Sequence, residues 1–292
     1  MLISCVVPTH SRTEFLRESV QSIIDQTLKP FELIVVSDVL DSQARALCEE
    51  LSASTDVPVI FEEDIEGRGG ASGSRNAGAR LASGSHIAFL DDDDLWEPSY
   101  LEHCSDVLAD SDADCVVSWI SMFKDGATAL GLAIKPNVSV RTGGVNAGMT
   151  GSNVIIDRAA FFELEGFDEN LRVMNDQDFF FRLLTSKYTF AVNARRDVLQ
   201  RKHDQGQLTG RTESRALGIM RYLEKHSKQL TLMQRRSLLL SAERIRFHAA
   251  SSRTRKLRHF LAGLWYSLPK EAFLSLRLRS RREFWLVRGS DS

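Results

Sequence analysis

Four consecutive aspartates, Asp91 to Asp94, directly follow the apolar segment 86–90. Adjacent carboxylates repel one another, so such a run is costly unless a cation or hydrogen-bond donors compensate its charge. At the end of a buried strand, the run is typical of a site that holds a divalent metal and the diphosphate that this metal neutralises. The alternative is a solvated acidic turn that caps a helix starting near 96–98. The run alone does not decide between them.

The segments around the run predict a sheet that would position it. Apolar runs predict strands, and apolar residues at helical spacing predict helices. The strands are expected at 2–7, 32–36, 57–61, 86–90, 115–122, 151–156 and 190–192. The helices are expected at 14–27, 42–52, 74–82, 99–110, 158–165 and 176–184, with an irregular or hairpin segment at 124–146. Short alternating strands and helices predict an α/β fold with a mainly parallel sheet, whose ligands bind beyond the carboxyl ends of the strands.

Three polar clusters fall at those strand ends: Pro8 with Thr9, Asp38, and the acid run. Asp38 can accept a hydrogen bond from a base or a ribose, although taken alone it is better explained as a helix N-cap. A glycine-rich stretch at 67–78 carries Arg75 and can face an anion, but it lacks the Gly-Lys-Ser/Thr of a phosphate loop. Its alternative is a flexible loop.

Later acids suggest a general base. Asp176 opens a predicted aromatic-rich helix, where acids ordinarily complement the helix dipole. A carboxylate aimed from there into the cleft can instead deprotonate an acceptor hydroxyl. Asp178 points elsewhere on that helix and is the weaker candidate. His203 is either a solvated side chain or a metal ligand, and its neighbours Arg201 and Lys202 suit phosphates.

Taken in order, these segments resemble family 2 glycosyltransferases with the GT-A fold. The resemblance covers about residues 2–210 and rests on VVPTHSR at 6–12, ELIVVSD at 32–38, SRNAG at 74–78, AFLDDDDLW at 88–96, GFDENL at 166–171 and NDQD at 175–178. It implies a Rossmann-like sheet flanked by helices in a catalytic domain at 1–210. That domain would consist of a nucleotide-binding half at 1–100 and an acceptor-side half at 101–210, with a basic helical region following at 211–292.

The resemblance also implies roles for individual residues. Contacts with the nucleotide-sugar donor fall to Pro8, Thr9, Arg12, Asp38, Arg75, Asp91 and Asp92. Asp93 would ligate Mn²⁺ or Mg²⁺, Asp94 would cap the helix that follows, and His203 resembles the late histidine that reaches the metal or the diphosphate. Asp176 matches the catalytic base. Asn153, Asn175 and Asp178 fall on the acceptor side.

Two departures from the family pattern affect the expected contacts. Ser37 and the pair Val39-Leu40 replace the family's frequent acid and its Gly-Ser, so the loop that contacts the base is expected to differ. Asn175 replaces a Glu, which leaves the acceptor contacts open.

The implied reaction is metal-dependent, inverting transfer of a sugar from a nucleoside diphosphate, with a uridine donor favoured. The expected acceptor is a hydroxyl of a saccharide or lipid-linked molecule in cell-surface polysaccharide synthesis. A nucleotidyltransferase would more naturally carry a glycine-rich basic signature in the first strand-helix turn, which 8–12 lacks. A non-catalytic nucleotide-sugar-binding module is the other alternative, and Asp93 and Asp176 argue against it.

Charge divides the 292-residue chain. Residues 1–210 hold 18 Lys and Arg against 33 Asp and Glu, a net charge of −15, whereas residues 211–292 hold 19 against 6, a net charge of +13. Helices are expected in this basic region at 214–230, 232–250, 254–266 and 270–278. Three interpretations stay open for it: a structural extension, a peripheral contact with an anionic membrane, or nucleic-acid binding. The last has charge but no motif and is not expected.

Composition favours a cytoplasmic protein, either free or peripheral on the cytoplasmic face of the membrane. The chain is 43% hydrophobic, enough for a sizeable core, yet no apolar stretch approaches the roughly 20 residues that span a bilayer. The N-terminal apolar segment is too short for a signal peptide and is expected to form a strand. The four cysteines are scattered, which argues against thiolate metal binding and favours a reducing compartment.

Overall fold

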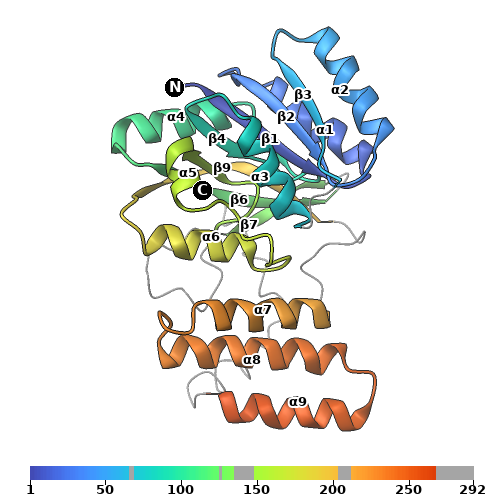
Figure 1. The fold of residues 1–292 in the computed structure, drawn as a ribbon, viewed down its shortest axis with the longest axis vertical. Helices are drawn as coiled ribbons and strands as arrows, with labels where there is room; N and C mark the ends of the chain where they lie inside the picture. Colours follow the sequence, from blue (N-terminus) through green and yellow to red (C-terminus); the bar gives the residue numbers. More distant parts are fainter. Residues whose placement is uncertain (66–68, 125–126, 135–147, 203–211, 268–292) are drawn as a thin grey trace. The chain divides into compact units, whose positions relative to one another are not determined.

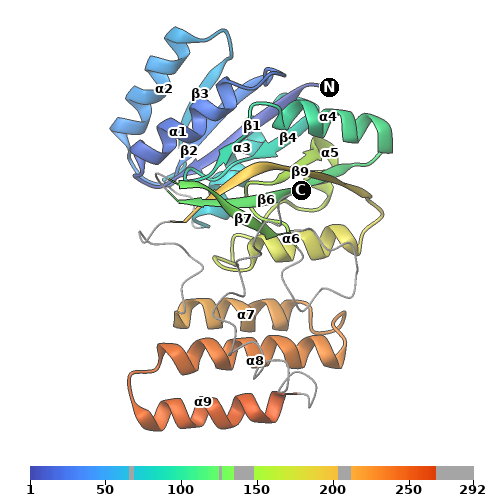
Figure 2. The same cartoon turned by 180° about the vertical axis from the view of Figure 1, so that it is seen from behind.

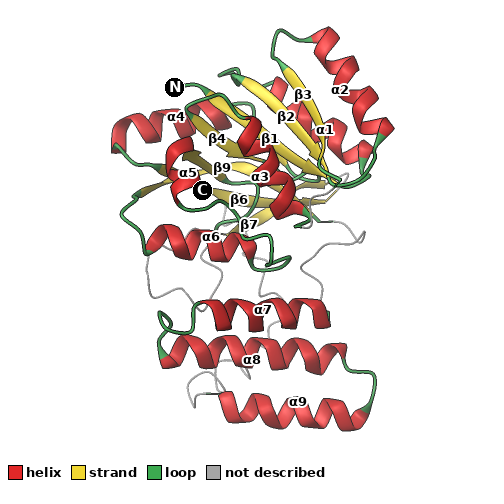
Figure 3. Ribbon diagram, viewed as in Figure 1, coloured by secondary structure: helices red, strands yellow, loops and turns green. Residues whose placement is uncertain are grey.

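The computed structural model describes residues 1–65, 69–124, 127–134, 148–202 and 212–267. The described residues through Lys202 form one compact unit, and those from Thr212 onward belong to a second. Figures 1 and 3 show the elements of each.

The first unit is built on a sheet that has nine strands within the described residues. The strands are β1 (Ile3–Thr9), β2 (Glu32–Ser37), β3 (Val59–Glu63), β4 (His86–Phe89), β5 (Leu95–Trp96), β6 (Cys115–Lys124), β7 (Ala127–Ile134), β8 (Val154–Asp157) and β9 (Phe190–Arg201). The helices of this unit are α1 (Thr13–Ile24), α2 (Ser42–Ser54), α3 (Ala71–Leu81), α4 (Tyr100–Ser111), α5 (Arg158–Glu163) and α6 (Asn175–Leu184).

The sheet changes character along its width. Its strand order is β3-β2-β1-β4-β8-β6-β9-β5, with β7 pairing with β6 beside this path. The first four strands are all parallel, as the sequence predicts for the nucleotide-binding half. Beyond β4 the pairing becomes mixed, because β8 runs antiparallel to both β4 and β6 while β9 runs parallel to β6. Because β1, β2 and β4 run parallel, their carboxyl ends lie at the same edge of the sheet. Thr9, Asp38 and the acid run are found at these ends.

Helices cover both faces of the sheet, because successive strand residues point to opposite sides. Cys5 and Ala88 belong to a core cluster filled by residues of α1, α2 and α4. On the other face, the Phe89 ring lies 5.3 Å from the rings of both Phe161 and Phe167. Phe179 of α6 joins this aromatic cluster, with its ring centroid 4.9 Å from that of Phe167. Phe161 and Phe167 thereby link α6 to β4, the strand that precedes the aspartates. Figure 2 shows the elements of this unit from behind.

Two strands differ from the sequence-based expectation. The structure extends the strand predicted at 190–192 to Arg201, with an irregularity in its pairing with β6 between Asn193 and Val198. This second half is rich in charged residues, so hydrophobicity does not reveal it. The acid run is followed by the short strand β5 and not by a helix, since α4 begins at Tyr100. The expectation that Asp94 caps a helix is therefore wrong.

The hairpin alternative for 124–146 holds for its described part, where β7 pairs antiparallel with β6.

The second unit contains three consecutive helices within the described residues: α7 (Glu213–Lys225), α8 (Leu232–Ala249) and α9 (Arg253–Tyr266). Hydroxyl side chains at positions 212, 231 and 252 cap their N-termini, and Thr231 with Gln234 forms a full capping box. Among the described residues, no helix has the length and apolar character that crossing a membrane would need. The helix expected at 270–278 lies outside the described residues.

Replacing Gly78 with alanine tests the packing of α3 on the sheet. An added Cβ would collide with Cγ1 of Val6 and come within 3.2 Å of Cγ2 of Val36, and both are buried β-branched side chains with little freedom to move. We expect Gly78→Ala to lower the free energy of unfolding by about 1–3 kcal/mol in urea titrations. Arg80→Ala, at an exposed position on the same helix, is the control. Equal stability of the two variants would contradict this packing.

Candidate active site

The acid run lies at the carboxyl edge of the parallel strands. β4 ends at Phe89, and the amide of Leu90 still donates to the carbonyl of Val6 at 3.1 Å, so the aspartates begin where pairing with β1 stops. β1 itself ends at Thr9, whose hydroxyl donates to Asp92 at 2.8 Å. The convergence predicted from the sequence is therefore present.

Neutral hydrogen-bond donors fix the backbone and the buried members of the run. The Ser19 hydroxyl of α1 lies 2.9 Å and 2.7 Å from the carbonyl oxygens of Asp92 and Asp94. The Ser152 hydroxyl donates to one carboxylate oxygen of Asp94 at 2.6 Å, and the backbone amide of Arg201 donates to the other at 3.0 Å. Both carboxylate oxygens of Asp94 thus accept from protein donors, which ties three segments together.

Two arginines contact the remaining carboxylates. Nη1 of Arg12 lies 3.0 Å from Asp93 and 3.4 Å from Asp92. Arg75, which is 5% exposed, forms an ion pair with Asp91. The Arg75 guanidinium lies 5.2 Å from the centre of the Phe167 ring, and any side chain at Gly151 would collide with it. These contacts fix a positive charge next to the first aspartate.

The environment opposes ionisation within the run. Burial, with repulsion from Asp93, raises the pKa of Asp92 to about 6. Burial likewise raises the pKa of Asp94 well above its usual range, and the charges of Asp93 and Asp91 add to the effect. Raised pKa values of this kind are common at functional sites.

The run also fits a divalent cation. Asp91, Asp93 and Asp94 each offer a carboxylate oxygen, and these oxygens lie within 4.8 Å of one another. Carboxylate oxygens are the ligands that Mg²⁺ and Mn²⁺ favour. Because Asp94 is 2% exposed and already bonded through both oxygens, the partly exposed Asp93 and Asp91 are the members best suited to reach an ion. The predicted ligand His203 lies outside the described residues.

The end of β2 brings Asp38 beside His10. Nδ1 of His10 lies 2.5 Å from the Asp38 carboxylate, and the Asp38 backbone amide donates to the Thr9 carbonyl at 3.4 Å. The alternative that Asp38 caps a helix does not hold, because Asp41 is the N-cap of α2 and accepts from the amide of Ala44 at 2.9 Å. Asp38 is thereby left at the site edge.

Pro8 is buried within β1, where it pairs with Val36.

Asp176 lies in the first turn of α6. Its carboxylate accepts from the amide of Gln177 at 2.8 Å, while the neighbouring Asn175 donates to the hydroxyl of Ser72 on α3 at 2.6 Å. Burial raises the pKa of Asp176. The positive charge of Arg75 lowers this pKa, and the negative charge of Asp91 raises it. The structure therefore brings the predicted base into electrostatic range of the acid run.

Two residues expected on the acceptor side have internal partners. Asp178 is fully buried and lies 2.8 Å from Arg182, which also bonds the carbonyl oxygens of Leu164 and Gly166. Asn153, also fully buried, accepts from the Thr150 amide and donates to the carbonyls of Ser118 and Gly148 at 2.7 Å and 2.9 Å. Both hold the local backbone in shape.

The sequence does not predict the contacts that three residues make with the acid run: Ser19, Ser152 and Arg201. Arg201 was expected to suit phosphates, but it is 2% exposed. It pairs with Glu18 at 2.6 Å and donates from Nε to the Asp93 carbonyl at 3.0 Å. The sequence gives no signal for these residues, because each stands among other polar residues.

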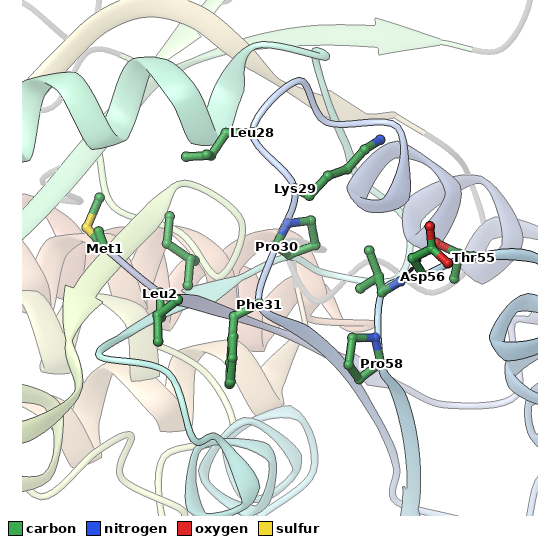
Figure 4. Close-up of a pocket in the computed structure, with 11 residues that line it drawn as sticks. Met1, Leu2, Leu28, Lys29, Pro30, Phe31, Thr55, Asp56 and Pro58 are labelled. Carbon is green, nitrogen blue, oxygen red and sulfur yellow. Dashed lines mark hydrogen bonds between the residues drawn. The ribbon is translucent and has the colours of Figure 1, made fainter.

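A separate pocket lies at the opposite, amino-terminal edge of the parallel strands (Figure 4). Its lining is mainly apolar, with Met1, Leu2, Pro30 and Phe31 around it. It contains no cluster of acids and lies away from the converging strand ends, so it is not the candidate active site.

The comparisons with known proteins agree with this geometry. The family described as "Glycosyl transferase family 2" matches residues 4–171, a span that contains the whole acid run. The chain belongs to glycosyl transferase family 2. The acid run lies within the span that this family matches, and the transferase class predicted from the sequence agrees with the family.

Curated relatives of this chain are also named as glycosyltransferases. An uncharacterized glycosyltransferase of Haemophilus influenzae is 31% identical over 191 residues, covering 63% of this chain and 62% of that protein. Glycosyltransferase GlyG of Streptococcus pneumoniae is 31% identical over 117 residues, covering 40% and 38% respectively. The glycosyltransferase described here thus matches less than two thirds of the length of each of these two relatives.

Solved structures confirm the GT-A fold class. S. aureus TarS 1-349 in complex with UDP superposes with a TM-score of 0.58 at 16% identity, covering 100% of this chain and 94% of that one. The mannosyltransferase PcManGT from Pyrobaculum calidifontis, in complex with GDP-Man and Mn²⁺, gives a TM-score of 0.63 at 16% identity, covering 95% and 79%.

The contrast between Asp178 and Asp176 yields a stability prediction. Asp178→Asn leaves the Arg182 guanidinium without its buried counter-charge, so we expect the free energy of unfolding to fall by about 2 kcal/mol or more. Asp176→Asn should leave it unchanged or raise it at pH 7. A pKa raised by folding means that the ionised carboxylate costs stability above that pKa, and a neutral amide removes this cost. Urea titrations compare the two. If Asp176→Asn lowers the free energy of unfolding more than Asp178→Asn does, the structural role given to the Asp178–Arg182 ion pair is contradicted.

Proposed function

We propose that this glycosyltransferase moves a sugar from a nucleoside-diphosphate donor to an acceptor hydroxyl, with inversion at the anomeric carbon. The observation that supports the proposal is the acid run at the edge where β1, β2 and β4 end, where Thr9 and Arg12 contact it and Asp176 is near enough to Asp91 for their charges to interact. The donor is best supported as a UDP-sugar. One fold neighbour is described in complex with UDP-GlcNAc, although another is described with GDP-Man.

A divalent metal, Mn²⁺ or Mg²⁺, would be held by Asp93 with Asp91 beside it. When bound, it supplies positive charge that offsets the charge developing on the departing diphosphate. The described mannosyltransferase neighbour carries Mn²⁺, which supports the same ligand class here.

Different side chains of the protein bind different parts of the donor. Arg12 and Arg75 present guanidinium groups at the acid run and suit the donor's phosphates. Asp92, held by Thr9, is directed to the ribose, and Asp38 to the base. His10, in hydrogen-bond contact with Asp38, adds a second polar group at the base position.

Asp176 acts as the general base in this proposal. Its carboxylate takes the proton of the acceptor hydroxyl as that oxygen bonds to the anomeric carbon and the bond from this carbon to the diphosphate oxygen breaks. A raised pKa makes a carboxylate a better base at neutral pH. A single displacement inverts the stereochemistry, as in inverting glycoside hydrolysis with a sugar hydroxyl in place of water.

We further propose that the acceptor is a saccharide or lipid-linked molecule of a cell-surface polysaccharide and that transfer takes place on the cytoplasmic side. The four cysteines support a reducing compartment, because all are free and buried in the structure.

A panel of UDP-, GDP- and dTDP-sugars tests the proposal directly. Release of nucleoside diphosphate is measured with Mn²⁺, with Mg²⁺ and with a chelator. We expect release from one donor class that depends on the metal. Binding without any turnover, with acceptor extracts included, would favour the non-catalytic alternative.

Replacing Asp176 with asparagine separates binding from chemistry. The amide keeps the side-chain volume but cannot take a proton, so we expect transfer to fall by roughly 10²–10⁴-fold. Donor affinity should change little, because this carboxylate lies on the acceptor side. Asp178→Gln at equal folded concentration serves as the comparison. Near-wild-type transfer by Asp176→Asn would remove the base assignment.

Replacing Asp93 with alanine tests the metal site. The change removes one of the two partly exposed carboxylates of the run. We therefore expect nucleotide affinity, measured by calorimetry with Mn²⁺, to fall at least tenfold, in keeping with the loss of a ligand and its charge. Affinity without the metal should change less. Asp110→Ala, at an exposed position on α4, is the matched control. If affinity with Mn²⁺ stays equal in both variants, Asp93 is not a ligand.

A further inference from the structure

Helix α9 carries its apolar residues on its exposed side. They recur at spacings of three and four, which places them on one face of a helix with about 3.6 residues per turn. We call this face the α9 stripe: Leu257 (58% exposed), Phe260 (46%), Leu261 (56%), Leu264 (52%) and Trp265 (80%). A helix that packs in a water-soluble bundle normally buries such a face.

The packing of α9 on α8 uses mainly other residues, although the ring of Phe260, the least exposed member of the stripe, lies 6.4 Å from that of Phe247 on α8. A Cβ at Gly263, the buried residue of α9, would lie 3.6 Å from Leu240. Nδ1 of His259 lies 2.7 Å from Glu243, and Arg236 donates to the carbonyl of Trp265 at 3.0 Å. Gly263 and His259 fall on the side of the helix opposite the centre of the α9 stripe. Apart from Phe260, the stripe is therefore left outside these contacts between α9 and α8.

The rest of the exposed surface of α9 is cationic. Arg253, Arg255, Lys256 and Arg258 are all exposed, and α9 contains no acidic residue. By helical geometry, Lys256 and Arg258 flank the stripe on its two sides. Long basic side chains at the border of an apolar face can keep their charges at the level of lipid headgroups while the apolar residues enter the acyl region.

We infer that the α9 stripe docks onto an anionic membrane surface. The exposed tryptophan suits the interfacial zone, and the four cations complement negatively charged headgroups. A second copy of this chain fits less well, because a contact between two stripes would bring the cations of both helices together without acids of α9 to offset them. Nucleic acid would use the cations but leave the apolar residues unsatisfied. The inference does not depend on the transfer reaction.

Vesicle co-sedimentation of the full chain tests it. The stripe variant combines Leu257→Gln, Leu261→Gln and Trp265→Gln, and the charge variant combines Arg253→Gln, Lys256→Gln and Arg258→Gln. All six positions are exposed, so folding should be kept, and circular dichroism checks this. The matched control is Leu232→Gln with Met233→Gln, two exposed apolar positions at the start of α8 (73% and 62%).

We expect the wild type and the control to bind vesicles of phosphatidylcholine with phosphatidylglycerol and to bind pure phosphatidylcholine weakly. Both the stripe and the charge variants should lose roughly tenfold or more of this partitioning. Added salt should weaken the binding of the wild type.

Equal vesicle binding by the wild type and the stripe variant would overturn the inference. So would a wild-type dimer, measured by light scattering without lipid, that the stripe variant converts to monomer. Binding to nucleic acid that the charge variant loses and the stripe variant keeps, without vesicle binding by the wild type, would also overturn it. Activity is not among the readouts, so failure of the proposed transfer reaction would be seen separately.

Discussion

The mutual repulsion of four adjacent carboxylates is the constraint around which the first unit is organised. A run such as Asp91–Asp94 persists at a sheet edge only where donors surround it. Thr9 comes from β1, Ser19 from α1, Ser152 from the turn before β8 and Arg201 from the end of β9. Segments far apart in the chain thus meet at the aspartates, and the site is also a junction of the fold.

Much of the fold could be predicted because its pattern is local. The parallel strands of the first half are short apolar runs between helices, and buried strands of this kind leave a clear signal. The second half of β9 leaves none, since Arg195, Arg196 and Asp197 interrupt it and its pairing with β6 is irregular. Short β5 was missed for a related reason: two residues, Leu95 and Trp96, form a strand only because β9 is there to pair with them.

The site shows a similar division between motif and context. The converging positions Thr9, Asp38 and Asp91–Asp94 follow from strand ends alone, and the structure brings them together. The partners of Ser19 could not be predicted, because a buried serine gives no sign in sequence of which carbonyl oxygens it will meet. Asp178 is placed like a catalytic acid in the sequence, but in the structure it forms an ion pair with Arg182. Arg182 also donates to the carbonyl oxygens of Leu164 and Gly166, and these contacts depend on the tertiary fold.

The aromatic cluster sets the separation between α6 and β4. Phe89 precedes the acid run, Phe179 lies one turn beyond Asp176, and Phe161 and Phe167 fill the space between them. Ring size in the core therefore sets how far the proposed base stands from the acids that face the donor. A smaller ring at any of these buried positions would leave a cavity between β4 and α6, so the same change would weaken the fold and free the proposed base to shift.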